Sequence, residues 1–174
     1  MHIRSLFTYP IKSCRGIEVE ELYLLPYGPK YDRTFVIVDG KGQFLSQRKH
    51  PKLCLIGTAI KDYVLLINIP DVGEFSIPLH QGKGVEREVV VWDDVCRGFD
   101  EGDLIAGAVS SFLGTSSRLV RYAPQHPRLR HSSHLNACVS VSFADAYPLL
   151  VISQASLDDL NQRLSQPLPM NRFR

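Results

Sequence analysis

The stretch TFVIVDGKGQFLSQR, at residues 34–48, restricts the possible folds more than any other part of this sequence. Two apolar runs, residues 34–38 and 43–47, lie on either side of Asp-Gly-Lys-Gly at residues 39–42. β-Branched and aromatic residues favour strands. Asp and Gly tolerate the positive φ angles of the tight turns that connect paired strands. The pattern therefore predicts a β-hairpin, which in turn favours an antiparallel fold.

Short strand-like stretches occur on both sides of this hairpin. Residues 16–22, GIEVEEL, alternate between apolar and charged side chains, which is typical of a half-buried strand. Further strands are expected at residues 53–60, 63–69, 75–79 and 87–92. Gly, Pro and Asp separate these stretches, and strands of this length and spacing favour an antiparallel barrel or sandwich.

The pattern changes after residue 100. Residues 100–114, DEGDLIAGAVSSFLG, place their apolar residues on one helical face, with Asp100 as the expected N-cap and Gly114 at the end. Residues 118–122 return to a strand, and the polar residues 123–134 predict a long surface loop or a connection between subdomains. A buried strand is then expected at residues 147–153, and a helix at residues 156–164 with Ser156 as its N-cap.

These elements predict an α+β protein, mostly β with some α. Residues 1–123 are expected to form an antiparallel β-barrel-like domain, and residues 124–174 a linker with the start of a second domain. The last segment, SQPLPMNRFR, reads like the beginning of further structure, so we expect the chain to be part of something longer.

Composition excludes several classes of function. The 174 residues are 44% apolar, enough for one ordinary core, and the net charge is only +2. No basic field therefore points to nucleic acid or to an anionic membrane surface. No apolar run approaches the roughly 20 residues that span a bilayer, and no signal pattern begins the chain. We expect a cytoplasmic protein. Association with a mitochondrial membrane would require a targeting segment outside this sequence.

The cysteines and histidines give little sign of a metal site. No C-x-x-C pair occurs among the four scattered cysteines, Cys14, Cys54, Cys96 and Cys138. A structural zinc site is therefore not expected, and we expect the thiols to be reduced. The three histidines of HPRLRHSSH, residues 126–134, have a spacing that a metal could use, but a polar loop is the favoured interpretation.

The stretch YPIKSCRGI, at residues 9–17, combines a strand end, a proline and several hydrogen-bond donors. It brings Lys12, Ser13 and Arg15 into one short turn. One interpretation is a solvated surface turn. The other is an anion site, because a phosphate is bound well by a cation, a hydroxyl donor and backbone N–H groups of a tight turn.

Four stretches together resemble a known family. YPIKSCRGI, YDRTFVIVDGKGQFLSQRKHPKL, FADAYPLLVISQASLDDLN and NRFR occur in the order found in MOSC proteins that have an N-terminal MOSC β-barrel domain. That branch includes the mitochondrial amidoxime-reducing component and its bacterial relatives. The same pair of domains ends molybdenum cofactor sulfurase. The resemblance covers nearly the whole chain, from residue 3 to residue 174.

The resemblance implies a site for the molybdenum cofactor, molybdopterin, between the barrel and the MOSC domain. It assigns the pterin phosphate to Lys12, Ser13 and Arg33. It also implies that Asp145 faces the cofactor, through N–H groups of the pterin ring, and that Arg174 does so from the family's F-R-P-N motif. A point cation, a hydroxyl and a guanidinium fork are a chemically sound set for a phosphate.

The sequence departs from the family pattern at the metal ligand. The family's molybdenum-ligating cysteine lies downstream of the matched region, and none of the four cysteines of this chain stands in its context. Cys14 adjoins the phosphate turn, but we expect it to be structural. The phosphate half-site is therefore expected without stable cofactor binding or redox chemistry in this chain alone.

Three functions remain open at this stage. The first is the N-terminal part of a molybdenum-dependent oxidoreductase that reduces N-hydroxylated compounds, with electrons from heme or flavin partner proteins. The second is a non-enzymatic β-barrel binding module. The third is part of a sulfur-transfer protein similar to molybdenum cofactor sulfurase.

The other charged and aromatic residues are given structural interpretations. Arg48 is expected to be an outward strand charge, Trp92 a core residue, and the pair Asp93-Asp94 an exposed turn at a strand end. A solvated basic face is the favoured interpretation of Arg118, Arg121, Arg128 and Arg130, and recruitment of an anion is the alternative.

Overall fold

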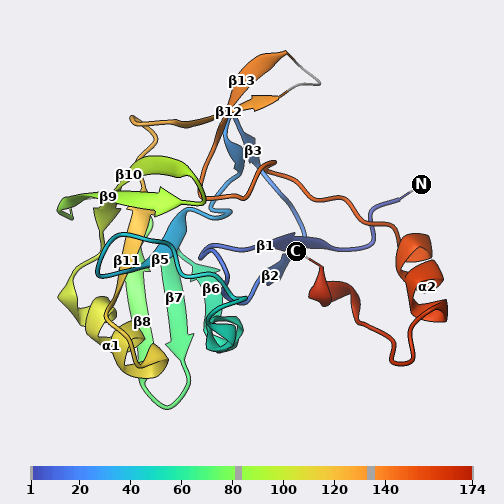
Figure 1. Cartoon of the computed structure of the whole chain (residues 1–174), viewed down its shortest axis with the longest axis horizontal. Helices are drawn as coiled ribbons and strands as arrows, with labels where there is room; N and C mark the ends of the chain where they lie inside the picture. Colours follow the sequence, from blue (N-terminus) through green and yellow to red (C-terminus); the bar gives the residue numbers. More distant parts are fainter. Residues whose placement is uncertain (1, 81–83, 133–135, 174) are drawn as a thin grey trace.

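The computed structural model describes residues 2–80, 84–132 and 136–173, and short antiparallel strands dominate it (Figure 1). The largest sheet has the strand order β5-β11-β10-β9. Its strands are β5 (Phe35–Asp39), β11 (Ser117–Tyr122), β10 (Asp94–Asp100) and β9 (Glu86–Val91). The predicted class, mostly β with α, is confirmed.

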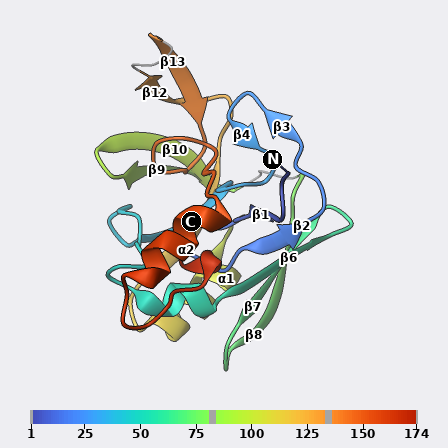
Figure 2. The same cartoon turned by 90° about the vertical axis from the view of Figure 1, so that its right-hand side faces the viewer.

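The remaining strands form one three-stranded sheet and three hairpins. The sheet contains β6 (Gly57–Lys61), β7 (Val64–Ile69) and β8 (Gly73–Pro78) in that order. The hairpins pair β1 (Leu6–Thr8) with β2 (Ile17–Val19), β3 (Leu24–Leu25) with β4 (Gly28–Pro29), and β12 (Arg128–Ser132) with β13 (Ala137–Val141). Figures 1 and 2 show the β12–β13 hairpin projecting from one end of the molecule.

Strand β5 is an outer strand of the largest sheet, but it is buried on both faces and lies between two core clusters. Phe35 and Ile37 point into the core cluster that β7 and helix α1 (Asp103–Leu113) also line. Val36 and Val38 point into a second cluster, with Val89 on β9 among their neighbours. A continuous apolar run is the signature of such a two-sided strand, and it explains why FVIVD contains no polar residue before Asp39.

The predicted hairpin turn at residues 39–42 is confirmed, although its second arm is not a regular strand. The N–H of Gly42 donates to the Asp39 carbonyl at 3.0 Å, and Gly42 has φ 82°. Residues 43–45 then bond to two strands at once. Leu45 N–H donates to the Ile37 carbonyl on β5, and Phe44 N–H donates to the Val90 carbonyl on β9. This segment therefore connects the two outer strands of the largest sheet and curls the sheet.

Helix α1 forms where the apolar spacing predicts it, and Gly114 ends it with φ 70°. Its N-cap, however, is Gly102 rather than Asp100. Asp100 lies two residues before Gly102, at the end of β10, where its carboxylate accepts the Gly102 N–H and pairs with Arg118. Leu104, which was placed on the apolar face, is 79% exposed.

Three sequence-based expectations are wrong. Residues 53–56 are not strand, because Pro51 starts a 3₁₀ helix, η1 (Pro51–Leu55), and the strand begins at Gly57. Part of the expected loop at 123–134 is strand β12, since its partner β13 satisfies its backbone. Residues 147–153 are not a buried strand: no strand pairs with them, and Val151 is 90% exposed.

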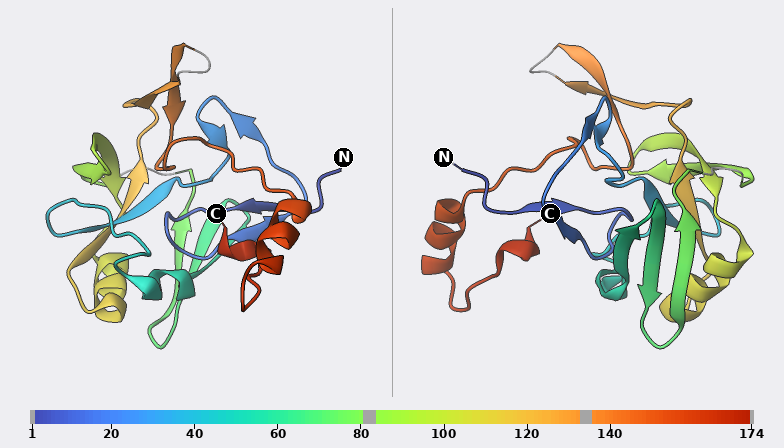
Figure 3. Two further views of the ribbon diagram at one scale, coloured as in Figure 1. Left: turned by 45° about the vertical axis from the view of Figure 1, so that its right-hand side comes forward. Right: turned by 180° about the vertical axis from the view of Figure 1, so that it is seen from behind.

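The C-terminal helix α2 (Gln154–Gln162) lies apart from the sheets, as Figures 1 and 3 show, and a short 3₁₀ helix, η2 (Met170–Arg172), follows it. The helix was expected, but its N-cap is Ser153, whose hydroxyl accepts the Ser156 N–H, rather than Ser156. No helix of the described residues is long and apolar enough to cross a membrane. The predicted domain boundary at residues 123–124 stays a prediction.

Asp100 provides a test of the fold through pH. Burial works to raise the pKa of Asp100, but hydrogen bonds from Arg118, the Gly102 N–H and Arg87 outweigh burial and hold that pKa below its ordinary value. A lowered carboxyl pKa stabilises the folded state above the ordinary pKa, and this gain disappears as the pH falls through the folded-state value. We expect Asp100→Asn to reduce the free energy of unfolding by about 2 kcal/mol at pH 7.

That difference should shrink below about pH 4. Urea unfolding of both proteins from pH 3 to pH 7 measures it. A gap that stays constant over this range would contradict the assignment.

Candidate anion site

Lys12 is held against β5 by backbone pairing. The N–H groups of Arg33 and Phe35 donate to the carbonyls of Tyr9 and Pro10, and the Lys12 N–H donates to the Phe35 carbonyl at 2.8 Å. Pro10 fits here because it only has to accept. The YPIKS stretch therefore lies beside residues 33–35, and the side chain of Lys12 is buried at 7% exposure.

The peptide of Phe143 connects Lys12 with Arg33. Its N–H donates to the Arg33 carbonyl at 3.0 Å, and its carbonyl accepts a hydrogen bond from Lys12 Nζ at 2.8 Å. Phe143 itself is fully buried in the core cluster of β9 and β11. Residues 110 or more positions apart in the sequence are thus fixed beside each other by one buried peptide.

Arg33 pairs with its neighbour Asp32 and stacks on an aromatic ring. Its Nη1 lies 2.6 Å from Asp32 Oδ2, and its guanidinium lies 4.5 Å from the centroid of the Tyr9 ring. Burial raises the pKa of Asp32, although Arg33 and the Tyr9 N–H act against this rise. The Arg33 side chain remains 22% exposed, so part of the guanidinium faces solvent.

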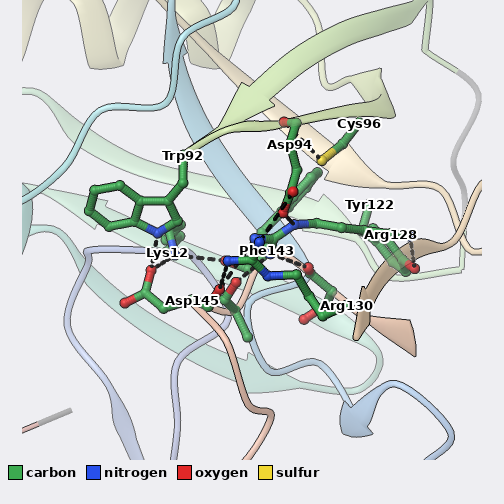
Figure 4. Close-up of polar contacts among 11 residues, drawn as sticks. Lys12, Trp92, Asp94, Cys96, Tyr122, Arg128, Arg130, Phe143 and Asp145 are labelled. Carbon is green, nitrogen blue, oxygen red and sulfur yellow. Dashed lines mark hydrogen bonds and ion pairs between the residues drawn. The ribbon is translucent and has the colours of Figure 1, made fainter. Parts of the chain in front are cut away.

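The carboxylate of Asp145 is the direct counter-ion of Lys12. Its Oδ1 lies 2.5 Å from Lys12 Nζ and accepts a hydrogen bond from Trp92 Nε1 at 2.7 Å. Figure 4 shows the ammonium of Lys12 and the indole of Trp92 both directed at this carboxylate. Unlike Lys12, Asp145 is open to solvent, with 65% of its side chain exposed.

The two partners of this ion pair have their pKa values lowered for different reasons. Burial lowers the pKa of Lys12, with smaller contributions from Arg33 and Arg128, and Asp145 only partly compensates. For Asp145, burial acts upward, but the charge and hydrogen bond of Lys12 and the hydrogen bond of Trp92 outweigh it, so the pKa falls. Asp145 is therefore ionised at neutral pH, and the buried ammonium depends on it.

Arg128 fixes the backbone that carries Asp145. Its guanidinium donates to the carbonyls of Ser142 and Ala144, to the Asp145 carbonyl at 3.3 Å, and to Asp94 Oδ2 at 2.7 Å. The side chain of Arg128 is 1% exposed. A buried arginine with every bond directed at carbonyls and one carboxylate acts as a rigid clamp on residues 142–145.

Sequence reasoning missed Trp92, Asp94 and Arg128 as parts of this site. Trp92 is 38% exposed at a strand turn rather than in the core. Asp94 begins β10 and pairs with Arg128 and Arg130, so only Asp93 fits the exposed turn. The solvated basic face is wrong for the buried residues Arg121 and Arg128. No local pattern marks these residues, because their partners come from distant segments.

Three residues of the site have backbone conformations that side chains usually avoid. Ser13, Arg33 and Trp92 have φ angles of 72°, 44° and 59°. Each such residue costs about 1 kcal/mol or more, and the cost persists only where surrounding contacts hold the conformation. Surrounding contacts must therefore hold these three residues of the site in place.

The structure brings four of the five predicted site residues together. Three segments meet at the Phe143 peptide: one carries Lys12 and Ser13, one carries Arg33, and the segment of Phe143 itself carries Asp145. Arg174 lies outside the described residues. Cys14 is fully buried, as expected of a structural thiol. Arg48 is exposed, as expected, and lies 5.6 Å from the Trp92 ring.

The charges of the site suit a phosphate. The ion pairs of the cluster contain one more cation than carboxylates, namely Lys12, Arg33, Arg128 and Arg130 against Asp32, Asp94 and Asp145. Arg48 adds a further cation that has no ion pair with any described residue. The described residues include no group of three or more His, Cys, Asp or Glu that could hold a metal. The donors of the described site are therefore of the kind that bind an anion such as phosphate.

The curled antiparallel sheet, with a cationic cluster beside its outer strand β5, defines a small β-barrel domain. The profile of the MOSC N-terminal beta barrel domain matches residues 1–116, and this chain belongs to that family.

The similar proteins include amidoxime-reducing components and molybdenum cofactor sulfurases. The chain is 33% identical over 182 residues to mitochondrial amidoxime-reducing component 1 of Mus musculus, covering 99% of this chain and 53% of that protein. It is 29% identical over 170 residues to molybdenum cofactor sulfurase of Danio rerio, covering 94% of this chain and 20% of that protein. The chain therefore spans about half the length of the amidoxime-reducing components that it matches.

One solved structure shares the fold. A solution structure of a Bordetella bronchiseptica protein matches 64% of this chain and 95% of its own, with a TM-score of 0.51 and 19% sequence identity. At this identity the likeness concerns the fold alone.

Replacing Arg128 tests its role as a clamp. Arg128→Met leaves several buried carbonyl groups without their donor, so we expect the free energy of unfolding to fall by about 3 kcal/mol. Arg130→Met is the matched control, because Arg130 reaches the same Asp94 and Asp145 carbonyl but is 35% exposed, and its loss should cost about 1 kcal/mol or less. Urea unfolding measures both, and equal losses would show that Arg128 is no special clamp.

Proposed function

We propose that this chain binds the phosphate end of a molybdenum cofactor through Lys12, Ser13 and Arg33. The observation that supports this most is the buried Phe143 peptide, which fixes Lys12 Nζ and the backbone of Arg33 on its two sides. The name of one similar protein, molybdenum cofactor sulfurase, points in the same direction.

The three side chains offer a phosphate different kinds of contact. Lys12 supplies a point charge, and two of its three N–H donors are taken by the Phe143 carbonyl and Asp145. Ser13 supplies a hydroxyl in a left-handed turn, and Arg33 a planar fork that is still partly exposed. Charged donors of this kind form the strong hydrogen bonds that phosphate groups attract.

The activity that fits this proposal is reduction of N-hydroxylated compounds. A bound molybdenum centre would supply the redox step, with electrons from heme or flavin partner proteins. The described residues of this chain would hold and orient the cofactor by its phosphate, and Asp145 would face it from the segment that Arg128 clamps. Activity of this kind is named for the mouse relative.

Sulfur transfer is the second candidate. The match to the Danio rerio sulfurase covers 94% of this chain, almost as much as the match to the amidoxime-reducing component. Both candidates require the same phosphate contacts. The first activity yields a substrate that has lost its N-hydroxyl group, whereas the second yields a cofactor that has gained sulfur. An assay for each product therefore distinguishes the two candidates.

Cofactor content tests the phosphate contacts. A C-terminally extended form of the chain, in which the cofactor is expected to bind stably, is purified from cells that make the molybdenum cofactor, and pterin per protein is measured for the wild type and for Lys12→Ala with Arg33→Ala. Hydrogen bonds to charged groups contribute about 1.5–3 kcal/mol each, and 1.4 kcal/mol is about tenfold in affinity. We expect the double variant to retain less than about a tenth of the wild-type pterin.

The matched control is Arg163→Ala, which removes an exposed cation from helix α2, away from the site. Its pterin content should equal that of the wild type. Equal pterin in the double variant and the wild type would refute the phosphate assignment.

A further inference from the structure

The ammonium of Lys12 is almost enclosed, and the carboxylate of Asp145 stands between it and solvent. The Lys12 side chain is 7% exposed, whereas that of Asp145 is 65% exposed. Figure 4 shows the carboxylate at the end of the Lys12 side chain, with the indole nitrogen of Trp92 directed at it beside the Lys12 ammonium. An anion that arrives from solvent meets Lys12 most directly at the position that the Asp145 carboxylate already occupies.

The backbone of Asp145 is fixed, but its carboxylate is not. Arg128 and Arg130 hold the Asp145 carbonyl, and Arg128 also holds the carbonyl of Ala144. The carboxylate itself is bound only by Lys12 and Trp92 among the described residues. Rotation between staggered side-chain conformations can therefore remove the carboxylate from Lys12 without moving the chain.

We propose that Asp145 is a built-in competitor at the anion site, and that it makes the site selective for dianions such as a phosphate ester. The proposal rests on the proposed phosphate function of Lys12, Ser13 and Arg33. Asp145 is a specificity-determining residue in this scheme, because an anion that takes the position of its carboxylate beside Lys12 must displace it.

The selectivity follows from the balance of charge. A monoanion that replaces the carboxylate brings the same charge to Lys12. It binds from solution, however, and so competes poorly with a carboxylate that is attached to the chain and has a high effective concentration there. A dianion brings one additional negative charge to a cluster in which Lys12, Arg33, Arg128 and Arg130 outnumber their carboxylates. Replacement of the Asp145 carboxylate is therefore favourable in free energy for the dianion alone.

Trp92 gives this exchange a direct signal. It is the only tryptophan of the chain, and its indole N–H donates to the same carboxylate oxygen that binds Lys12. Displacement of Asp145 must change the partner of this N–H. The single indole resonance in a ¹H–¹⁵N spectrum therefore reports on the Asp145 carboxylate.

The experiment titrates the whole chain with sulfate, a dianion, and with nitrate, a monoanion. The proteins are the wild type, Asp145→Asn, Lys12→Ala and the control Asp159→Asn, which neutralises an exposed carboxylate on α2. Asparagine still accepts hydrogen bonds from Lys12 and Trp92, so the fold is retained. The midpoints are read from the indole resonance and from calorimetry, which does not depend on Trp92.

We expect sulfate to bind Asp145→Asn at least tenfold more tightly than the wild type. Nitrate should bind measurably only to Asp145→Asn, and Lys12→Ala should bind neither anion. Asp159→Asn should behave like the wild type.

Two results separate this inference from the proposed function. If Lys12→Ala abolishes sulfate binding but Asp145→Asn leaves the affinity and the preference over nitrate unchanged, the competitor role is wrong and the phosphate site stands. If sulfate binds to neither the wild type nor Asp145→Asn, both the inference and the phosphate site are wrong.

Discussion

The site of this protein depends on one buried peptide. The N–H of Phe143 donates to the Arg33 carbonyl, and its carbonyl accepts from Lys12 Nζ at 2.8 Å. A buried peptide group must find partners because an unpaired one is costly. The segment that carries Asp145 is thereby attached to β5, and the pairing of Lys12 with Asp145 follows from that attachment.

The rest of the site can be understood as compensation for burying a lysine. Burial lowers the pKa of Lys12, and Asp145 supplies the counter-charge that the low-dielectric surroundings demand. Arg128 holds the backbone of that counter-ion, and β5, buried on both faces, provides the rigid support. Because this counter-ion is exposed, a ligand can replace it. The group that neutralises buried Lys12 is thus also the group that a phosphate would displace in the proposed function.

The sequence correctly predicted those elements whose conformation depends on residues close together in the chain. The Asp-Gly-Lys-Gly turn, helix α1 and its end at Gly114 are examples. Prediction failed where a distant partner decided the outcome. Residues 128–132 look like a polar loop, but β13 makes them a strand. Residues 147–153 look like a buried strand, but no described strand pairs with them, and Leu149, Leu150 and Val151 are exposed. The family resemblance found Lys12, Arg33 and Asp145, whereas Trp92 and Arg128 carried no local signal.

The sequence by itself determined the antiparallel class of the fold, the family and the donors of the anion turn, because turn residues, alternation and short motifs act over a few positions. Only the tertiary structure decided that Lys12 is buried, that Asp145 covers it and that Arg128 is a clamp. The physical reason is that the charge state and the accessibility of a side chain depend on which distant groups share its low-dielectric surroundings.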